Sequence, residues 1–214
     1  MNKPFLADEV LNVMTAGVVI TDHAKGLGDI SLADRAAAIW DRAFSPDVLD
    51  WLDGLASENL PEGRVLVQPS AARGSLELIC EKSGTPAGAH RDALIEDAAM
   101  LVEHFLEAVP APWIRIRLDV VTGNACRRFH IDAVKARLIC TYRGTGTQYG
   151  NASDGVTPDH IHTVPTGAPV ILRGTKWPET PEANLRHRSP PIEGSGETRL
   201  LLVVDPIFDP EDEA

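Results

Sequence analysis

The second half of the chain, from residue 113 onward, has the two-residue hydrophobic period that is typical of β-strands. Residues 113–121 alternate apolar with charged side chains, which predicts a strand with one buried face. Residues 138–142 and 169–172 are short runs of β-prone side chains, and each predicts a further strand. Residues 200–204 are apolar throughout, so we expect a strand that is buried on both faces.

The first half of the chain has longer stretches with the 3.6-residue period of helices. Residues 90–109 carry a broad apolar stripe and predict the longest helix. Ser45 and Pro46 have the composition of a helix start and predict a short helix. A capping sequence at Ser31, followed by apolar positions at helical spacing, predicts another helix over residues 32–43. Short strands are expected at residues 17–20, 64–68 and 74–80.

These elements predict an α+β protein. We expect a mainly helical N-terminal region, residues 1–112, packed on a C-terminal antiparallel double-stranded β-helix, or jelly roll, formed by residues 113–206. Residues 207–214 form an acidic tail that we expect to be frayed.

Composition is that of an ordinary globular protein, with 43% hydrophobic and 24% charged residues. Apolar runs stay far shorter than the roughly 20 residues of a membrane helix, so we expect no membrane partner. The N-terminus lacks the pattern of a secretory signal. The three cysteines are odd in number and widely spaced, which argues against a disulfide framework. We therefore expect a cytoplasmic location.

Charge is unevenly distributed along the chain, whose net charge is −11. Residues 1–112 carry 8 basic and 18 acidic side chains, whereas residues 113–206 carry 12 basic and 9 acidic ones. The acidic total disfavours nucleic acid as a partner, because phosphate contacts require clustered cations. The locally cationic second half suits a small anionic ligand such as a dicarboxylate.

The candidate chemistry lies at His130, Asp132 and His187. On a strand, residues two apart share a face, so His130 and Asp132 would point the same way. Two histidines and one carboxylate form the facial triad that binds non-haem Fe(II) and leaves coordination positions open. His187 would complete this triad from a distant segment.

The order of these residues resembles the Fe(II)/2-oxoglutarate-dependent dioxygenase superfamily. The similarity rests on His130-x-Asp132, a glycine turn at Gly167 into a strand, His187, and Arg199 downstream. It implies that the triad binds Fe(II) and that Arg199 forms an ion pair with the far carboxylate of 2-oxoglutarate. Tyr142 resembles a strand residue that helps to bind the same carboxylate. The implied activity is hydroxylation of a small-molecule or protein substrate whose identity the sequence leaves open.

The second half of the chain also resembles an uncharacterised bacterial family of unknown function. That resemblance brings an association with zinc homeostasis, so a non-catalytic zinc-binding or metal-homeostasis protein using the same three ligands stays an alternative.

Other candidate site residues have simpler explanations. His160 and His162 could bind zinc, but we expect them in a loop near the mouth of the site. Cys126 and Cys140 could join His130 in a soft zinc site, although packing is the simpler role for both. Four arginines could contact substrate or form a solvated basic rim: Arg127, Arg128, Arg186 and Arg188.

Overall fold

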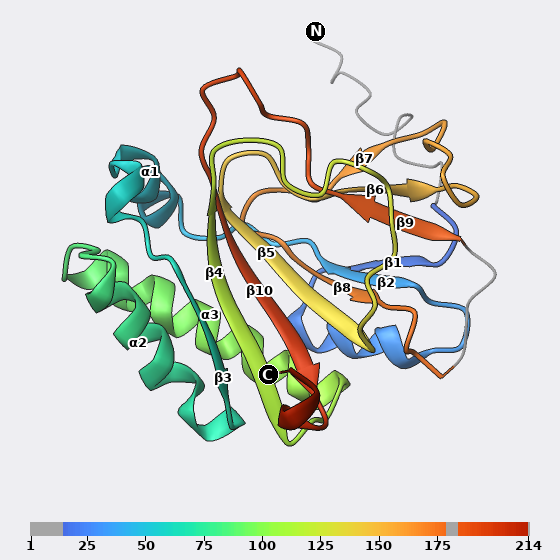
Figure 1. Cartoon of the computed structure of the whole chain (residues 1–214), viewed down its shortest axis with the longest axis horizontal. Helices are drawn as coiled ribbons and strands as arrows, with labels where there is room; N and C mark the ends of the chain where they lie inside the picture. Colours follow the sequence, from blue (N-terminus) through green and yellow to red (C-terminus); the bar gives the residue numbers. More distant parts are fainter. Residues whose placement is uncertain (1–14, 179–183, 214) are drawn as a thin grey trace, which may run out of the picture.

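A computed structural model of the chain describes residues 15–178 and 184–213, and its centre is a seven-stranded sheet (Figure 1). The strand order is β1-β2-β8-β5-β10-β4-β3. Its strands are β1 (Val18–Thr21), β2 (Ala37–Trp40), β3 (Gly63–Val67), β4 (Trp113–Val121), β5 (Ala136–Arg143), β8 (Pro169–Arg173) and β10 (Arg199–Ile207). A three-stranded sheet of order β7-β6-β9 is built from β6 (Gln148–Asn151), β7 (His162–Thr163) and β9 (Leu185–Arg188).

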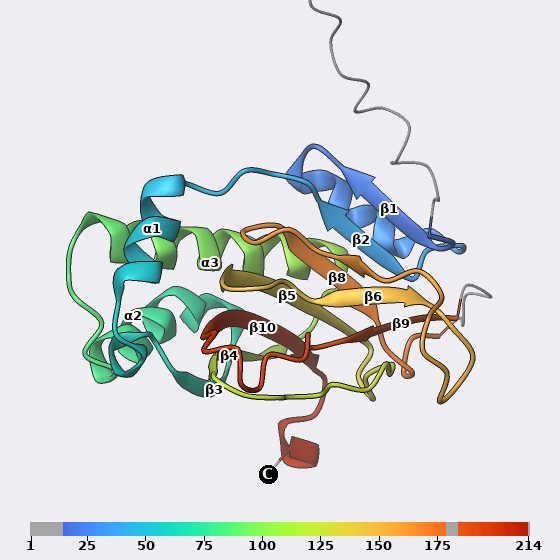
Figure 2. The ribbon, with the colours of Figure 1, turned by 90° about the horizontal axis from the view of Figure 1, so that it is seen from above.

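Strand β10 lies between β5 and β4 in the large sheet, and its two faces contribute to two different apolar cores. Leu200, Leu202 and Val204 pack into the core on the helical side. Leu201 and Val203 belong to a second core, which also contains Tyr149 of β6 and Leu185 of β9. The small sheet therefore packs on the face of the large sheet that lies away from the helices, as Figures 1 and 2 show.

Helices α1 (Pro46–Gly54), α2 (Ala72–Lys82) and α3 (Ala89–Ala108) lie along the other face of the large sheet (Figure 2). Leu94, Leu101 and Phe105 of α3 are almost fully buried in the helical-side core. Short 3-10 helices complete the described elements: Ala24–Ser31, Ser57–Asn59, Pro69–Ala71 and Pro210–Glu213. The last of these gives the acidic tail regular structure, where fraying was expected.

The predicted helix over residues 32–43 is wrong, because this segment supplies strand β2. Ala37 and Ile39 pack into the core between the two sheets, whereas Ala38 packs into the core on the helical side. A run that is buried on both faces satisfies a helical period by coincidence. Arg173 donates to the carbonyls of Ile30, near the end of the 3-10 helix Ala24–Ser31, and of Leu32, which follows that helix.

The predicted strand at residues 74–80 is also wrong, because the segment forms helix α2. Its buried residues Leu76, Ile79 and Cys80 recur three and four positions apart, which is the spacing of one helix face. The predictions of the long helix, of the helix starting at Pro46 and of the strands near residues 18–20, 64–67 and 113–121 are confirmed. β1 lies at the edge of the sheet, as expected for a short strand.

The architecture is a mixed α+β fold with one large sheet. Strands β1, β2 and β3 precede residue 113 and join the same sheet as β4 and β10. The division into regions 1–112 and 113–206 stays a prediction. None of the helices in the described parts of the chain is both long and apolar enough to cross a lipid bilayer.

Candidate metal centre

Two histidines from distant segments meet where the small sheet approaches β5. The His130 amide donates to the His187 carbonyl and the His187 amide donates to the His130 carbonyl, both at 3.0 Å. This isolated antiparallel bridge places the two imidazole ring centroids 4.6 Å apart. Strand β9 thus fixes His187, and the bridge positions the segment that carries His130.

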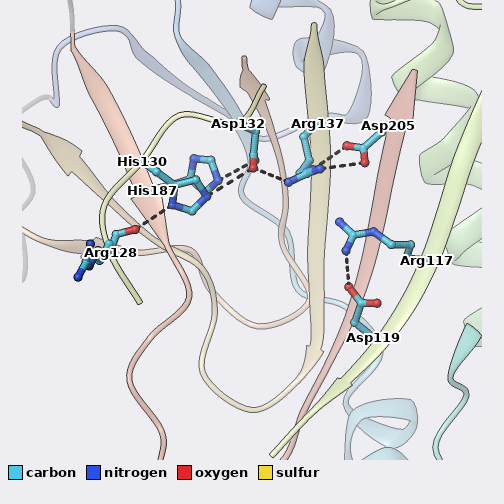
Figure 3. A network of polar contacts seen from close by, with 8 residues as sticks. All are labelled: Arg117, Asp119, Arg128, His130, Asp132, Arg137, His187 and Asp205. Carbon is cyan, nitrogen blue, oxygen red and sulfur yellow. Dashed lines mark hydrogen bonds and ion pairs between the residues drawn. The ribbon is translucent and has the colours of Figure 1, made fainter. Parts of the chain in front are cut away.

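The Asp132 carboxylate faces both imidazoles on one side and Arg137 on the other (Figure 3). Its Oδ1 is 3.4 Å from His130 Nε2, and its Oδ2 is 3.0 Å from His187 Nε2. One ligand atom from each of the three residues falls within 4.8 Å of the others. The His130 Nδ1 atom lies 2.8 Å from the Arg128 carbonyl, and the tautomer that donates there from Nδ1 leaves the Nε2 lone pair for a metal ion.

The three side chains have distinct protonation behaviour. Burial opposes ionisation of Asp132, but the adjacent imidazoles and Arg137 outweigh it and lower the pKa of the carboxyl. Burial lowers the pKa of His187. Contact with Asp132 raises the pKa of His130, against partial burial. Near neutral pH the site therefore offers a carboxylate and at least one neutral imidazole, which are the forms that bind metal.

Asp132 is positioned by Arg137, whose guanidinium also binds the buried carboxylate Asp205. Arg137 Nη1 is 2.6 Å from Asp132 Oδ1, and the same guanidinium donates twice to Asp205, at 2.6 and 2.9 Å. Asp205 is fully buried on β10. The sequence analysis missed Arg137 and Asp205. Their signal was a charged residue at an inward position of a strand, since Asp205 shares its face with Leu201 and Val203.

The three residues suit a divalent metal ion. Asp132 Oδ2 is buried, yet it accepts no hydrogen bond of acceptable geometry from any described residue, although His187 Nε2 is close. A facial triad uses two imidazole nitrogens and one carboxylate oxygen as metal ligands. These three atoms lie close together here, and they do not use up one another's hydrogen-bonding capacity. The carboxylate would gain a partner if an ion bound between the three ligand atoms.

Arg199 is the second unusual side chain of this region. It is fully buried at the start of β10, and its Nε donates to the Thr145 carbonyl at 2.6 Å. Nη1 and Nη2 have no hydrogen-bond partner in the parts of the chain that the structure describes. Burial lowers the pKa of Arg199 to about 10, while Glu197 opposes this shift. A buried guanidinium with two unpaired nitrogens fits a planar carboxylate that can accept two parallel hydrogen bonds.

A cavity of about 140 Å³ opens beside the three candidate ligands. Arg199 does not line it directly, but it shares the inward face of β10 with Leu201, which does. Its Cα partner on β4 is Val121, another lining residue. The polar and charged side chains around the cavity are His130, Asp132, His187, Arg117, Asp119, Arg137, Thr147, Arg188, Cys126 and Ser189.

The structure contradicts the expectation for Tyr142. Its side chain lies on the helical side of β5, in the core, and its hydroxyl donates to Asp97 of α3 at 2.6 Å. Arg42 forms a bidentate ion pair with the same carboxylate, at 2.6 and 2.7 Å. Tyr142 therefore contributes to a buried structural network and cannot contact a ligand on the opposite face of the sheet.

The local structure around the candidate ligands also differs from the prediction. His130 and Asp132 were expected to share a face of one strand, but β5 begins only at Ala136. The backbone bridge to His187 and the ion pair with Arg137 bring these side chains together instead. The three residues meet as expected, and their role as metal ligands stays a prediction.

The alternative metal sites considered from the sequence are not formed by the described residues. His162 stacks on Tyr149 with ring centroids 5.3 Å apart, and His160 is exposed. Cys140 is buried in the helical-side core, where burial raises the pKa of its thiol to about 12, whereas Cys126 is exposed beside the cavity. The alternative zinc site formed by both cysteines and His130 is therefore wrong.

The rim arginines differ in their contacts. Arg186 is paired with Asp154 at 2.9 Å, and Arg188 donates to Gln148 while stacking over the Phe129 ring. Arg127 and Arg128 are exposed.

Solved structures with a similar fold include dioxygenases. The dioxygenase for auxin oxidation 1 from Arabidopsis thaliana, in its complex with 2-oxoglutarate, superimposes with a TM-score of 0.50 at 9% identity, covering 90% of this chain and 92% of that one. The dioxygenase for auxin oxidation from rice gives 0.49 at 12% identity, covering 88% and 79%. A prolyl-4-hydroxylase from Pseudomonas putida gives 0.44 at 13% identity, covering 87% and 98%.

The resemblance to the dioxygenase superfamily is thus confirmed at the level of the fold. No curated protein sequence matches the chain. The sequence profile described as "Protein of unknown function (DUF1826)" matches residues 21–205. Since this match spans most of the chain, the protein belongs to the DUF1826 family.

Proposed function

We propose that this protein is a non-haem Fe(II)/2-oxoglutarate-dependent oxygenase that hydroxylates its substrate. The observation that carries the proposal is Arg199, a fully buried guanidinium with two unpaired nitrogens on the strand face that lines the metal-site cavity. A zinc-binding protein needs no such group. A site for a dicarboxylate needs one, because a guanidinium holds a carboxylate with two parallel hydrogen bonds.

In this proposal His130, Asp132 and His187 hold Fe(II) on one face, and Arg199 binds the far carboxylate of 2-oxoglutarate. The bound iron and 2-oxoglutarate supply the oxidation of a C–H bond by O2. The fold is a jelly roll whose helices cover the outer face of the large sheet. The protein's own contribution is to fix the geometry of the ligands, since Arg137 holds Asp132 and β9 holds His187.

An anaerobic titration tests the proposal. Metal-free protein is titrated with Fe(II) and then with 2-oxoglutarate, while the weak visible charge-transfer band of an iron–oxoacid chelate is recorded. We expect the band in the native protein and its loss in His187→Ala. His160→Ala is the matched control, because His160 is an exposed histidine outside the candidate centre and should leave the band unchanged.

The role of Arg199 is tested separately from that of the metal ligands. Arg199→Met should still bind Mn(II), observed by electron paramagnetic resonance, but should lose the 2-oxoglutarate band. A band of native strength in Arg199→Met would refute the anchor assignment. Tight zinc binding with no 2-oxoglutarate chelate in the native protein would refute the oxygenase proposal in favour of a metal-handling role.

A further inference from the structure

Arginines gather on the inward face of the large sheet next to the candidate metal centre. Ile114, Ile116 and Leu118 of β4 pack into the helical-side core, so the residues between them face the opposite way. Those residues are Arg115 and Arg117, and Arg117 lines the cavity together with His130, Asp132 and His187. Figure 3 shows Arg117 with Asp119, beside the pair formed by Arg137 and Asp205.

The register of β3 on β4 places two arginines directly opposite each other. Arg64 of β3 is the Cα partner of Arg117 of β4, and directly opposite residues of an antiparallel pair project from the same face. Like charges at such positions destabilise a sheet. Besides burial, the positive charges of Arg64, Arg117 and Arg137 lower the pKa of Arg115, while Asp205 opposes the shift. The strand register therefore concentrates positive charge next to Arg117.

Two carboxylates of this face are paired with Arg137 and Arg117. Asp205 accepts hydrogen bonds from Nε and Nη2 of Arg137, and Asp119 lies 3.1 Å from Arg117 Nη1. Arg117 Nε is buried and has no hydrogen-bond partner among residues 15–178 and 184–213. Asp132 also lines the cavity, and a bound metal ion would neutralise it. An additional anion next to Arg117 would accept a hydrogen bond from Nε of this residue and compensate its charge.

We propose that the substrate of this site carries an acidic group, a carboxylate or a phosphate, and that Arg117 binds it with Arg64 and Arg115 adding positive potential. The inference rests on the proposed oxygenase function. A small acidic molecule fits better than nucleic acid, because the net charge of −11 repels a polyanion. Arg117 thus determines specificity for a substrate held beside the metal rather than for 2-oxoglutarate, which is assigned to Arg199.

Binding of small acidic probes tests the inference on the full chain. The protein is loaded with Mn(II) and 2-oxoglutarate, so that the metal centre and Arg199 are occupied without turnover. Phosphoserine and N-acetylaspartate are then titrated by calorimetry, with glycerol as the uncharged control. Relaxation of the phosphorus or acetyl nuclei by Mn(II) reports whether the probe lies next to the metal, and the two probes distinguish phosphate from carboxylate recognition.

We expect at least one acidic probe to bind beside Mn(II), to weaken with added salt, and to bind at least about tenfold more weakly to Arg117→Gln. Arg73→Gln, which removes an exposed arginine of α2 paired with Glu77 and Glu96, should bind as the native protein does. The melting temperature of Arg117→Gln should be equal or higher, because the repulsion with Arg64 is relieved. A purely structural Arg117 would lower it.

Equal probe binding by Arg117→Gln and the native protein would overturn the inference. So would the absence of binding by both acids, or tight binding of a single-stranded oligonucleotide when neither acid binds. If Mn(II) and 2-oxoglutarate bind but acids do not, this inference fails and the oxygenase proposal stands. If acids bind through Arg117 in a protein that takes up no metal, the oxygenase proposal fails and Arg117 remains an anion site without a substrate role.

Discussion

Arg137 connects the candidate metal ligand Asp132 to the fully buried Asp205, and its planar guanidinium reaches both carboxylates at once. Arg137→Lys keeps the positive charge but loses this fork geometry. We expect its affinity for Mn(II) to fall by about 10- to 100-fold, the usual effect of removing a group that orients a ligand. Titration followed by electron paramagnetic resonance measures the loss, with Arg73→Lys as the surface control. Unchanged affinity would show that Asp132 needs no such support.

Tyr142 allows a test of its structural role. Its hydroxyl donates to the Asp97 carboxylate, which Arg42 also binds, in the core between α3 and β5. Tyr142→Phe loses one buried, charge-assisted hydrogen bond, so we expect a loss of about 1–3 kcal/mol in the free energy of unfolding. Urea denaturation measures this. The affinity for 2-oxoglutarate should stay unchanged, and a large decrease would return Tyr142 to the ligand site.

The two histidines predict how metal affinity depends on pH. Contact with Asp132 raises the pKa of His130, so protons compete with metal for this imidazole at a higher pH than for a free histidine. Burial lowers the pKa of His187, which is then already neutral. Affinity for Mn(II) should therefore fall as the pH decreases through the raised pKa of His130. Calorimetry in buffers of different ionisation enthalpy should detect proton release near neutral pH, and a pH-independent affinity would contradict this assignment.

At the scale of elements, periodicity predicted those segments that have one buried face. β4 alternates and α3 has one apolar stripe, and both were predicted within a residue or two. β2 could not be recognised, because residues 37–39 are buried on both faces and small alanines suit a helix equally well. The same ambiguity affected Tyr142, since residues 138–142 of β5 are apolar or buried on both faces. Which face meets the helices is decided by tertiary packing.

The candidate centre was predictable only in part for a similar reason. The residue types of His130, Asp132 and His187 are informative by themselves, and their order along the chain suggested the site. The supports are not visible in the sequence, because Arg137 and Asp205 lie 68 residues apart and meet only through the pairing of β5 with β10. Likewise, the opposition of Arg64 and Arg117 depends on the register of β3 on β4.

Gly174 fixes the segment that carries Asp132 against the end of β8. The Gly174 amide donates to the Lys135 carbonyl, and the next amide, of Thr175, donates to the Asp132 carbonyl, both at 2.9 Å. A Cβ atom on Gly174 would overlap the carbonyl oxygen of Val134 and crowd that of Asp132. Gly174→Ala should therefore displace residues 132–135 and lower both the melting temperature and the Mn(II) affinity.

Gly28→Ala is the matched control for this change, because a Cβ at Gly28 meets no atom within 4 Å. Calorimetric melting and Mn(II) titration of both variants provide the comparison. Native metal affinity in Gly174→Ala would mean that the backbone contacts with β8 do not position Asp132.

At the scale of the whole molecule, apolar cores lie on both faces of the large sheet, but the candidate site lies on the face away from the helices. Helices α1–α3 cover one face with an apolar core. On the opposite side lie Asp132 Oδ2, Arg117 Nε and the two terminal nitrogens of Arg199, for which the described residues supply no hydrogen bond. Buried polar atoms without partners cost folding free energy, so ligands that supply the partners should stabilise the fold.

Thermal unfolding measures that stabilisation directly. A ligand at about 100 times its dissociation constant adds about 2.7 kcal/mol to the free energy of unfolding, which corresponds to a rise of about 5–11 °C for a domain of this size. We expect Mn(II) to raise the melting temperature, and 2-oxoglutarate to raise it further only when Mn(II) is present. His187→Ala should abolish both increments.

Arg199→Met separates the two increments. It should retain the rise caused by Mn(II) and lose the one caused by 2-oxoglutarate. Because the variant removes a buried charge whose terminal nitrogens lack partners, its melting temperature without ligands should be equal to or above that of the native protein. A strongly destabilised Arg199→Met would instead mean that the guanidinium stabilises the fold through its bond to the Thr145 carbonyl, and the case for a 2-oxoglutarate anchor on β10 would fail.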